Sequence, residues 1–158
     1  MAVYGYSGEI LRVDLSSGKT STMPTSDYAS RFLGGRGIAA KIYWDEVSPA
    51  VGALDPDNRL LFMTGPLCGF PGLSGSRWAI CGKSPATDPE SFTYCNLGGS
   101  WGAHLKFAGY DGVVVHGASD KPVYILVEDG NASIFDESHL WGKGNIDTRR
   151  ALKEAHRD

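Results

Sequence analysis

The sequence lacks most of the features that mark a specialised class of protein. It has only three cysteines, Cys68, Cys81 and Cys95, and their wide separation matches no C-x-x-C zinc knuckle. The odd number argues against a disulfide scaffold, so we expect reduced, partly buried thiols in a reducing, cytoplasmic compartment. No apolar run approaches the length of a membrane span, and the first ten residues lack the basic and apolar regions of a signal peptide. We therefore expect no membrane association.

The sequence also has no excess of positively charged residues. Lys and Arg total 15 and Asp and Glu total 18, which gives a formal net charge of −3 at pH 7. No basic run is visible, so we expect no nucleic-acid partner. Apolar residues make up 42% and charged residues 21% of the chain. These values are typical of a globular domain and exclude a disordered tail or a coiled coil, and 158 residues correspond to one domain or a piece of a larger protein.

Glycine is the residue that the sequence has in excess. There are 21 glycines without a fixed period, which excludes collagen and indicates tight turns or close approach of a ligand to the backbone. Three segments carry many of them, residues 34–37, 72–77 and 96–102. None fits the P-loop or the G-x-G-x-x-G fingerprint, so the sequence does not support a site of either nucleotide-binding class.

Local patterns predict an α+β unit with antiparallel hairpins and short helices. Apolar runs and alternation predict strands over residues 8–15, 20–23, 59–64, 77–82, 92–94, 113–115, 123–128 and 132–135. Helices are expected over residues 25–32, 37–47, 100–108 and 148–156.

Turn and cap residues refine this outline. Thr25 or Ser26 is the expected N-cap of the first helix and Gly34 its C-cap. The two prolines within residues 48–58 predict a loop. Residues 106–111 are expected to form a structural corner in which a glycine ends a helix. The last helix has no cap and no tail, which suggests that the chain was cut from something longer.

Residues 96–102 have the chemistry of a site for an anion or a heterocycle. Glycines just ahead of a helix leave backbone N–H groups free at its positive end. Missing Cβ atoms let a flat ligand lie against the main chain. Asn96 adds both a donor and an acceptor for the edge of a heterocycle. The alternative is an ordinary strand-to-helix turn.

Two arginines flank the other glycine segments. The planar fork of Arg77 suits bidentate contact with a phosphate or a ring edge, and a structural ion pair is the alternative. Arg36 has the same chemistry, but its place between two helices favours packing. His104 is the most plausible functional histidine, although a packing role is favoured for it too. The pattern shows no catalytic acid, base or nucleophile and no metal site.

A series of short blocks occurs in a fixed order along the chain. They are GEILRVDLSSG (8–18), FLGGRG (32–37), GPL (65–67), SR (76–77) with KSP (83–85), NLGG (96–99), LKFAGYD (105–111), KPVY (121–124) and HLWGK (139–143). This series resembles the N-terminal domain of the tungsten-containing aldehyde:ferredoxin oxidoreductase family and spans nearly the whole chain.

The resemblance implies a β-rich, sandwich-like base of antiparallel sheets with short helices, in which residues 1–158 form a single cofactor-supporting domain. It implies a tungsten, or molybdenum, centre held by two molybdopterin-type ligands. Arg77, Asn96 and Gly98 match family positions that contact the pterin. Family enzymes oxidise an aldehyde to its carboxylic acid and pass electrons through an iron–sulfur cluster to ferredoxin or a similar acceptor.

The resemblance also implies that much of the enzyme lies outside this chain. The family's domain continues beyond Asp158 into a second glycine-rich stretch that contacts the pterin, so the chain is expected to be incomplete at its C-terminal end and inactive alone. The 4Fe-4S ligands and the acid–base residues belong to later domains, and the three cysteines receive no cluster role. A homodimer of the full-length enzyme stays open.

Two other functions remain open at this point. Cys68 in GPLCG and the YWDEV segment (43–47) are similar to the branch of tungsten enzymes that reduce aromatic-ring thioesters. The first alternative is therefore a subunit of a tungsten-dependent aryl-CoA reductase. The second is a non-catalytic scaffold fragment.

Overall fold

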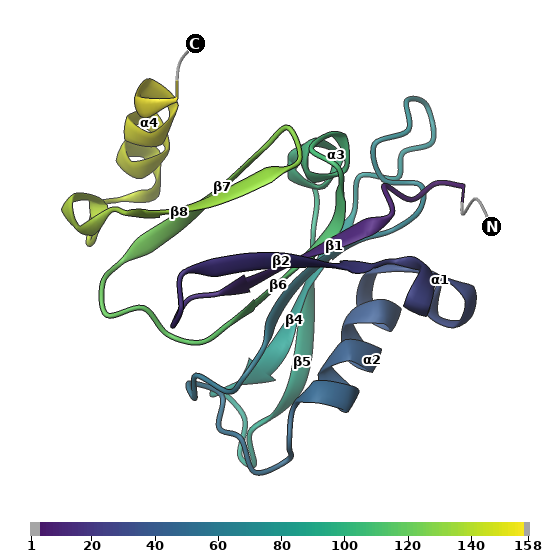
Figure 1. Cartoon of the computed structure of the whole chain (residues 1–158), viewed down its shortest axis with the longest axis horizontal. Helices are drawn as coiled ribbons and strands as arrows, with labels where there is room; N and C mark the ends of the chain where they lie inside the picture. Colours follow the sequence, from purple (N-terminus) through teal and green to yellow (C-terminus); the bar gives the residue numbers. More distant parts are fainter. Residues whose placement is uncertain (1–3, 157–158) are drawn as a thin grey trace.

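A six-stranded sheet forms the centre of the computed structural model, which describes residues 4–156. The strand order is β2-β1-β6-β3-β4-β5 (Figure 1). The strands are β1 (Glu9–Asp14), β2 (Lys19–Pro24), β3 (Leu60–Thr64), β4 (Trp78–Ser84), β5 (Ser91–Leu97) and β6 (Tyr110–His116). β1 and β6 pair in parallel, and the other neighbours pair antiparallel, so the expected antiparallel sheet contains one parallel pair.

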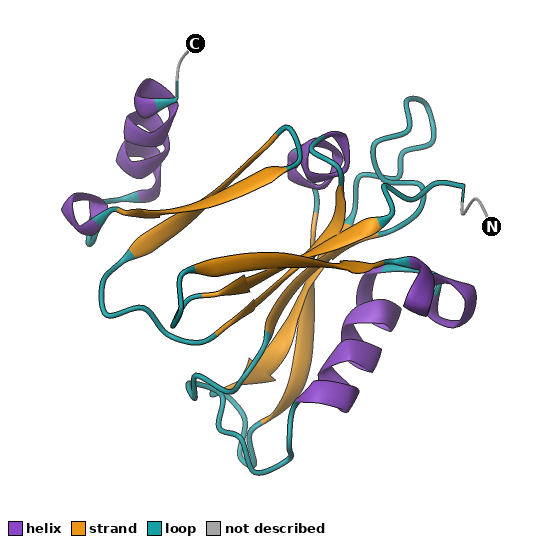
Figure 2. Ribbon diagram, viewed as in Figure 1, coloured by secondary structure: helices purple, strands orange, loops and turns teal. Residues whose placement is uncertain are grey.

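The remaining elements lie outside this sheet. They are the hairpin β7 (Val123–Glu128) and β8 (Asn131–Asp136), the helices α1 (Ser26–Phe32), α2 (Gly35–Glu46), α3 (Trp101–Phe107) and α4 (Asn145–Ala155), and the short 3-10 turn η1 (Ser138–Leu140). Figure 2 shows α1 and α2 on one face and the β7–β8 hairpin across the other. No helix within residues 4–156 is long and apolar enough to cross a bilayer.

Side-chain alternation along the strands produces two apolar cores. In β1, Ile10 points toward α2, whereas Leu11 and Val13 point toward the hairpin. The core under α2 is built mainly from Ile10, Ile38, Ile42, Leu61, Met63 and Val114. The core under the hairpin is built from Leu11, Val13, Leu105, Tyr110 and Val113, with Ile125, Val127 and Ile134 packed against it. The sheet is thus covered on both faces, which is the layered arrangement expected from the sequence.

The junction between α1 and α2 differs from the prediction. Leu33, with φ +58°, takes the helix-ending position expected for Gly34. Gly34 instead lies against the turn after β3, where a Cβ would come within 3.1 Å of Pro66 Cδ and 3.2 Å of Gly65 Cα. The absence of a side chain at Gly34 serves this close approach, and α2 begins at Gly35, two residues earlier than predicted.

The corner after α3 agrees with its prediction, with Gly109 at φ +95°. Asp111 is 4% exposed, and its carboxylate accepts hydrogen bonds from the amides of Ser7 and Gly8, both at 2.9 Å. Lys106 Nζ lies 2.6 Å from Asp111 Oδ1. This buried ion pair joins the start of the chain to α3 and β6.

Thr25, the N-cap residue of α1, also belongs to this network through its side chain. Its hydroxyl donates to Asp111 Oδ2 at 2.7 Å, and α1 has no side-chain N-cap hydrogen bond. Because Thr25 is buried and Asp111 is a charged acceptor, its hydroxyl gains a stronger hydrogen bond there than at the helix start. Thr25 thus occupies the N-cap position of α1, as predicted, but its side chain does not make the capping hydrogen bond.

Candidate functional site

A pocket opens where the start of α2 meets the turn after β3 and the neighbouring ends of β4 and β5. Its volume is about 200 Å³. The polar side chains that line it are those of Arg36, Arg77 and Asn96. Gly34, Gly35 and Gly65 contribute main chain to its wall. All three polar side chains belong to exposed residues, so the pocket is open to a ligand.

Strand pairing explains why Arg77 and Asn96 share this pocket. Arg77 directly precedes β4, Asn96 lies near the end of β5, and Ala79 pairs with Asn96 in the β4–β5 register. Residues paired across a sheet point to the same face, and Ala79 packs in the core under α2. Asn96 therefore points to the face that α2 covers. The sequence pattern predicts a strand that ends at residue 94 and a turn that contains Asn96, whereas pairing with β4 extends β5 to Leu97.

Gly98 lies two residues beyond Asn96 and is not part of the pocket lining. Its carbonyl accepts a hydrogen bond from Trp78 Nε1 at 3.2 Å. A Cβ placed on Gly98 would meet no atom within 4 Å. The fold itself therefore does not require glycine here, and the main chain at Gly98 is open to the close approach of a ligand.

Arg36 is the pocket residue that sequence reasoning missed, because its position between two helices favoured packing. It lies in the first turn of α2, and its guanidinium carbon is 4.1 Å from the centroid of the Tyr94 ring on β5. Nothing in the local sequence signals this contact, since it depends on how α2 lies over the sheet. The structure thus adds a second guanidinium to the pocket that Arg77 and Asn96 share.

The pocket is cationic. No acidic residue lines it, and the first turn of α2 contains none. Within residues 4–156, neither Arg36 nor Arg77 lies in a salt bridge, so the structural ion pair considered for Arg77 is not formed there. Unpaired guanidinium groups are well suited to bind a phosphate or another anion.

The cysteines have a different chemistry from the pocket. Cys68 and Cys81 are buried, Cys95 is exposed, and all three are free. Burial raises the pKa of the Cys81 thiol to about 11 and also raises the pKa of Cys68. Both thiols are therefore protonated at neutral pH, and a protonated thiol is a poor metal ligand. Across residues 4–156, no three His, Cys, Asp or Glu side chains gather as a metal site.

His104 lies away from the pocket, in an apolar environment. It lines a cavity of about 390 Å³ under the hairpin, together with Phe62, Trp101 and Val127. Its ring packs edge-on to Phe107 with centroids 6.2 Å apart. His104 is nevertheless exposed, and Phe107 is exposed as well, so the structure does not bury His104 as the favoured packing role would require.

The family of the chain follows from a match to a known family model. The model described as "Aldehyde ferredoxin oxidoreductase, N-terminal domain" matches residues 10–158. The chain belongs to this family. The chain is 42% identical over 154 residues to the tungsten-containing aldehyde ferredoxin oxidoreductase of Pyrococcus horikoshii. The aliphatic sulfonate oxidoreductase, WOR-like subunit, of Pyrococcus furiosus is 36% identical over 161 residues.

These relatives are much longer than this chain. The match to the Pyrococcus horikoshii protein covers 96% of this chain and 25% of the relative. The domain therefore spans a quarter of the length of the curated relatives that it matches, and the relatives are oxidoreductases.

A solved structure confirms the fold. The active-site complex BamBC of benzoyl coenzyme A reductase, in complex with 1,5-dienoyl-CoA, superposes with a TM-score of 0.91 and 37% sequence identity. The superposition covers 96% of this chain and 23% of that chain. The family resemblance and the α+β fold predicted from the sequence are thus both confirmed.

Proposed function

We propose that this domain supports the pterin part of a tungsten, or molybdenum, cofactor in an enzyme that oxidises aldehydes to carboxylic acids. The observation that carries the proposal is the meeting of Arg77 and Asn96 in one cationic pocket. It occurs in a chain whose relatives include tungsten-containing aldehyde ferredoxin oxidoreductases. In this proposal residues 1–158 are a single cofactor-supporting domain of a longer protein.

The groups around the pocket fit a phosphorylated pterin. The Arg77 guanidinium can donate two parallel hydrogen bonds to a phosphate or to a ring edge. The Asn96 amide both donates and accepts, as the edge of a pterin ring requires. Gly98 leaves room beside the main chain for a flat ring. The pocket offers no thiolate, imidazole or carboxylate, so the dithiolene sulfurs of the cofactor would hold the metal.

The bound cofactor would supply two-electron redox chemistry. An aldehyde and a water molecule become a carboxylic acid, and an electron pair and two protons are released. In this proposal the electrons pass to a 4Fe-4S cluster held by later domains and then to ferredoxin or a similar acceptor. The role of this chain's own residues is to bind and orient the pterin.

The proposal is tested on the full-length protein that carries this chain, produced without oxygen in medium containing tungstate. We expect Arg77→Ala to lower the tungsten and pterin content, because truncating a charged contact to a ligand weakens binding by about 2–5 kcal/mol. Aldehyde oxidation with benzyl viologen as acceptor should fall in parallel. Unchanged metal content together with a lower melting temperature would show that Arg77 serves the fold instead.

A second candidate is a subunit of a tungsten-dependent aryl-CoA reductase. The observation that favours it is the 0.91 TM-score and 37% identity to the benzoyl coenzyme A reductase complex. The two candidates differ in substrate, so the purified protein should be offered a series of aldehydes and, separately, an aromatic CoA thioester with a low-potential donor. Dienoyl-CoA formation without aldehyde turnover would select the reductase. A full-length protein with neither metal nor pterin would favour the scaffold fragment.

A further inference from the structure

We propose that Arg36 is a second anion-binding residue of this pocket and that it acts with Arg77 to hold the phosphate of the pterin cofactor. This inference rests on the proposed function and adds a residue and a role to it. The sequence alone favoured a packing role for Arg36. None of the similar proteins reported above assigns a function to this residue.

The backbone around Arg36 is fixed by its glycine neighbours. A Cβ on Gly34 would lie 3.2 Å from the carbonyl oxygen of Thr64, and a Cβ on Gly37 would lie 2.5 Å from that of Phe32. A side chain at Gly37 is therefore excluded on steric grounds, and one at Gly34 would make a tight contact that its neighbours could relieve only by shifting. The tight turn that they form directs the first turn of α2, and with it Arg36, to the ends of β4 and β5.

Tyr94 holds the Arg36 guanidinium without using its hydrogen-bond donors. The ring centroid lies 4.1 Å from the guanidinium carbon, a cation–π contact. Tyr94 precedes Asn96 by two residues on β5 and therefore points to the same face. The stack keeps the planar guanidinium in the pocket that Asn96 also lines. Within residues 4–156 Arg36 has no salt-bridge partner, so its N–H groups are available to a ligand.

The charge around Arg36 differs from that around the structural arginines of this chain. Arg12 and Arg59 both bind Glu46, with N···O distances of 2.5 and 3.0 Å. Arg36 and Arg77 face one small pocket with no carboxylate in its lining. Two guanidinium groups that line one pocket without a neighbouring carboxylate are suited to bind an anionic ligand. A phosphate has enough acceptor oxygens to accept hydrogen bonds from both guanidinium groups.

The test compares three arginine-to-glutamine variants of the full-length protein, purified without oxygen. Tungsten and pterin phosphate are measured per protein after dialysis at raised salt. We expect Arg36→Gln to reduce both about tenfold, the loss expected for one charge-assisted hydrogen bond. Arg77→Gln should reduce both as well. Arg31→Gln is the matched control, because Arg31 is an exposed arginine over a Phe32 ring that does not line the pocket.

A second readout uses inorganic phosphate and the cofactor-free protein. Phosphate should protect Arg36 and Arg77, but not Arg31, from labelling by phenylglyoxal, as mapped by mass spectrometry. Loss of cofactor in Arg77→Gln with wild-type content in Arg36→Gln would overturn this inference and leave the proposed function standing. Wild-type content in both variants would reject the pocket as the pterin site. Equal labelling of Arg36 with and without phosphate would also overturn the inference.

Discussion

At the scale of single residues, the buried pair of Lys106 and Asp111 is central to a network that joins the start of the chain to α3 and β6. Both side chains are almost fully buried, 7% and 5% exposed, and the carboxylate also accepts hydrogen bonds from the amides of Ser7 and Gly8. We expect Asp111→Asn to lower the free energy of unfolding by about 3–5 kcal/mol, because it leaves the Lys106 ammonium buried without its partner. Urea unfolding followed by circular dichroism measures this loss.

The exposed pair of Lys41 and Asp45 on α2 is the control for that experiment. Asp45→Asn also removes one carboxylate, but solvent screens this pair, so the expected loss is about 0.5 kcal/mol or less. Equal losses in the two variants would mean that burial of the Lys106–Asp111 pair contributes nothing.

Addition of a methyl group at two glycines near Trp78 should have different effects on the stability of the fold. A Cβ on Gly102 would lie 2.9 Å from Cys68 Sγ and 3.3 Å from Trp78 Cδ1, so Gly102→Ala should destabilise the fold. A Cβ on Gly98 would meet nothing within 4 Å, so Gly98→Ala should leave the melting temperature unchanged. In the full-length protein, Gly98→Ala should still lower pterin content, which a fluorescence assay of the released pterin would detect. Wild-type pterin content would show that no ligand approaches Gly98.

At this scale the sequence can indicate a candidate residue where the chemistry of that residue is local. Arg77 and Asn96 each follow or lie within a glycine-bearing segment, and their side chains carry recognisable donors, so both could be selected before any fold was known. Arg36 could not, because its partner Tyr94 is far away along the chain and meets it only in the folded sheet.

At the scale of elements, hairpins were the most predictable parts. The strands at Glu9–Asp14 and Lys19–Pro24, and those at Val123–Glu128 and Asn131–Asp136, are joined by turns whose residues the sequence shows directly. β5 was predicted too short, because its residues are largely exposed and its full length comes from pairing with β4. The parallel pairing of β1 with β6 has no local signal, since these strands are far apart along the chain.

Glu46 forms salt bridges that connect the end of α2 to the sheet, and the stability that they contribute should depend on pH. Its carboxylate binds Arg12 on β1 and Arg59 just before β3. Burial alone would raise the pKa of Glu46, but the hydrogen bonds and charges of the two arginines outweigh burial and place it below its ordinary value of 4.5. The stabilisation is therefore fully present above the unfolded-state pKa and is lost as the pH falls through the folded-state pKa.

We expect Glu46→Gln to lower the free energy of unfolding at pH 7 and to flatten its decline in acid. Urea midpoints of the two proteins, measured from pH 7 to pH 3, should differ most at neutral pH and converge below the ordinary pKa of 4.5. Asp45→Asn, at the neighbouring position, should shift the midpoint little across this range. A difference between Glu46→Gln and the parent that stays constant with pH would contradict the proposed role of the ionised carboxylate.

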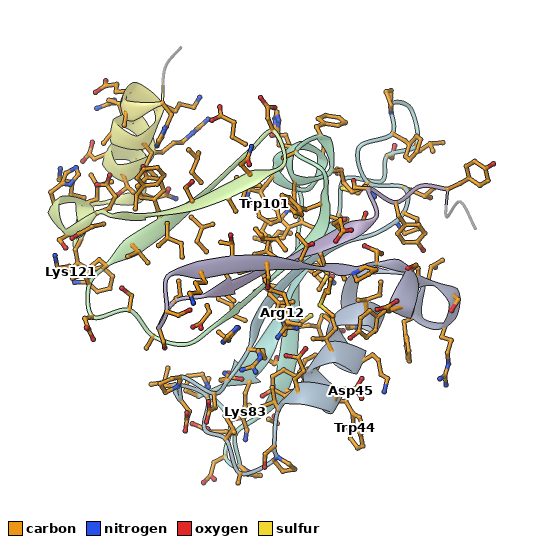
Figure 3. All side chains as sticks on the ribbon, viewed as in Figure 1. Arg12, Trp44, Asp45, Lys83, Trp101 and Lys121 are labelled. Carbon is orange, nitrogen blue, oxygen red and sulfur yellow. The ribbon has the colours of Figure 1, made fainter. Side chains whose placement is uncertain are left out.

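At the scale of the whole molecule, large apolar side chains remain exposed at several separate places. Trp44 is 83% exposed and points away from α2 (Figure 3), and Leu54 is 86% exposed. Trp141 and Ile146, before and at the start of α4, are 78% and 74% exposed, and no residue of α4 is buried. Aromatic side chains such as Trp44 and Trp141 are enriched where one protein surface contacts another. The relatives are four times longer than this chain, so the proposed occupant is the remainder of the enzyme.

This assignment predicts a difference between the 158-residue chain and the full-length protein. Produced alone and shown by circular dichroism to be folded, the short chain should bind the dye ANS and self-associate as its concentration rises, because its apolar faces have no partner. The full-length protein should bind less dye per molecule, although it is larger. Trp44→Gln with Trp141→Gln in the short chain should reduce dye binding while leaving the sheet intact, because neither side chain belongs to either core. A short chain that stays monomeric without binding dye would show that these faces need no cover.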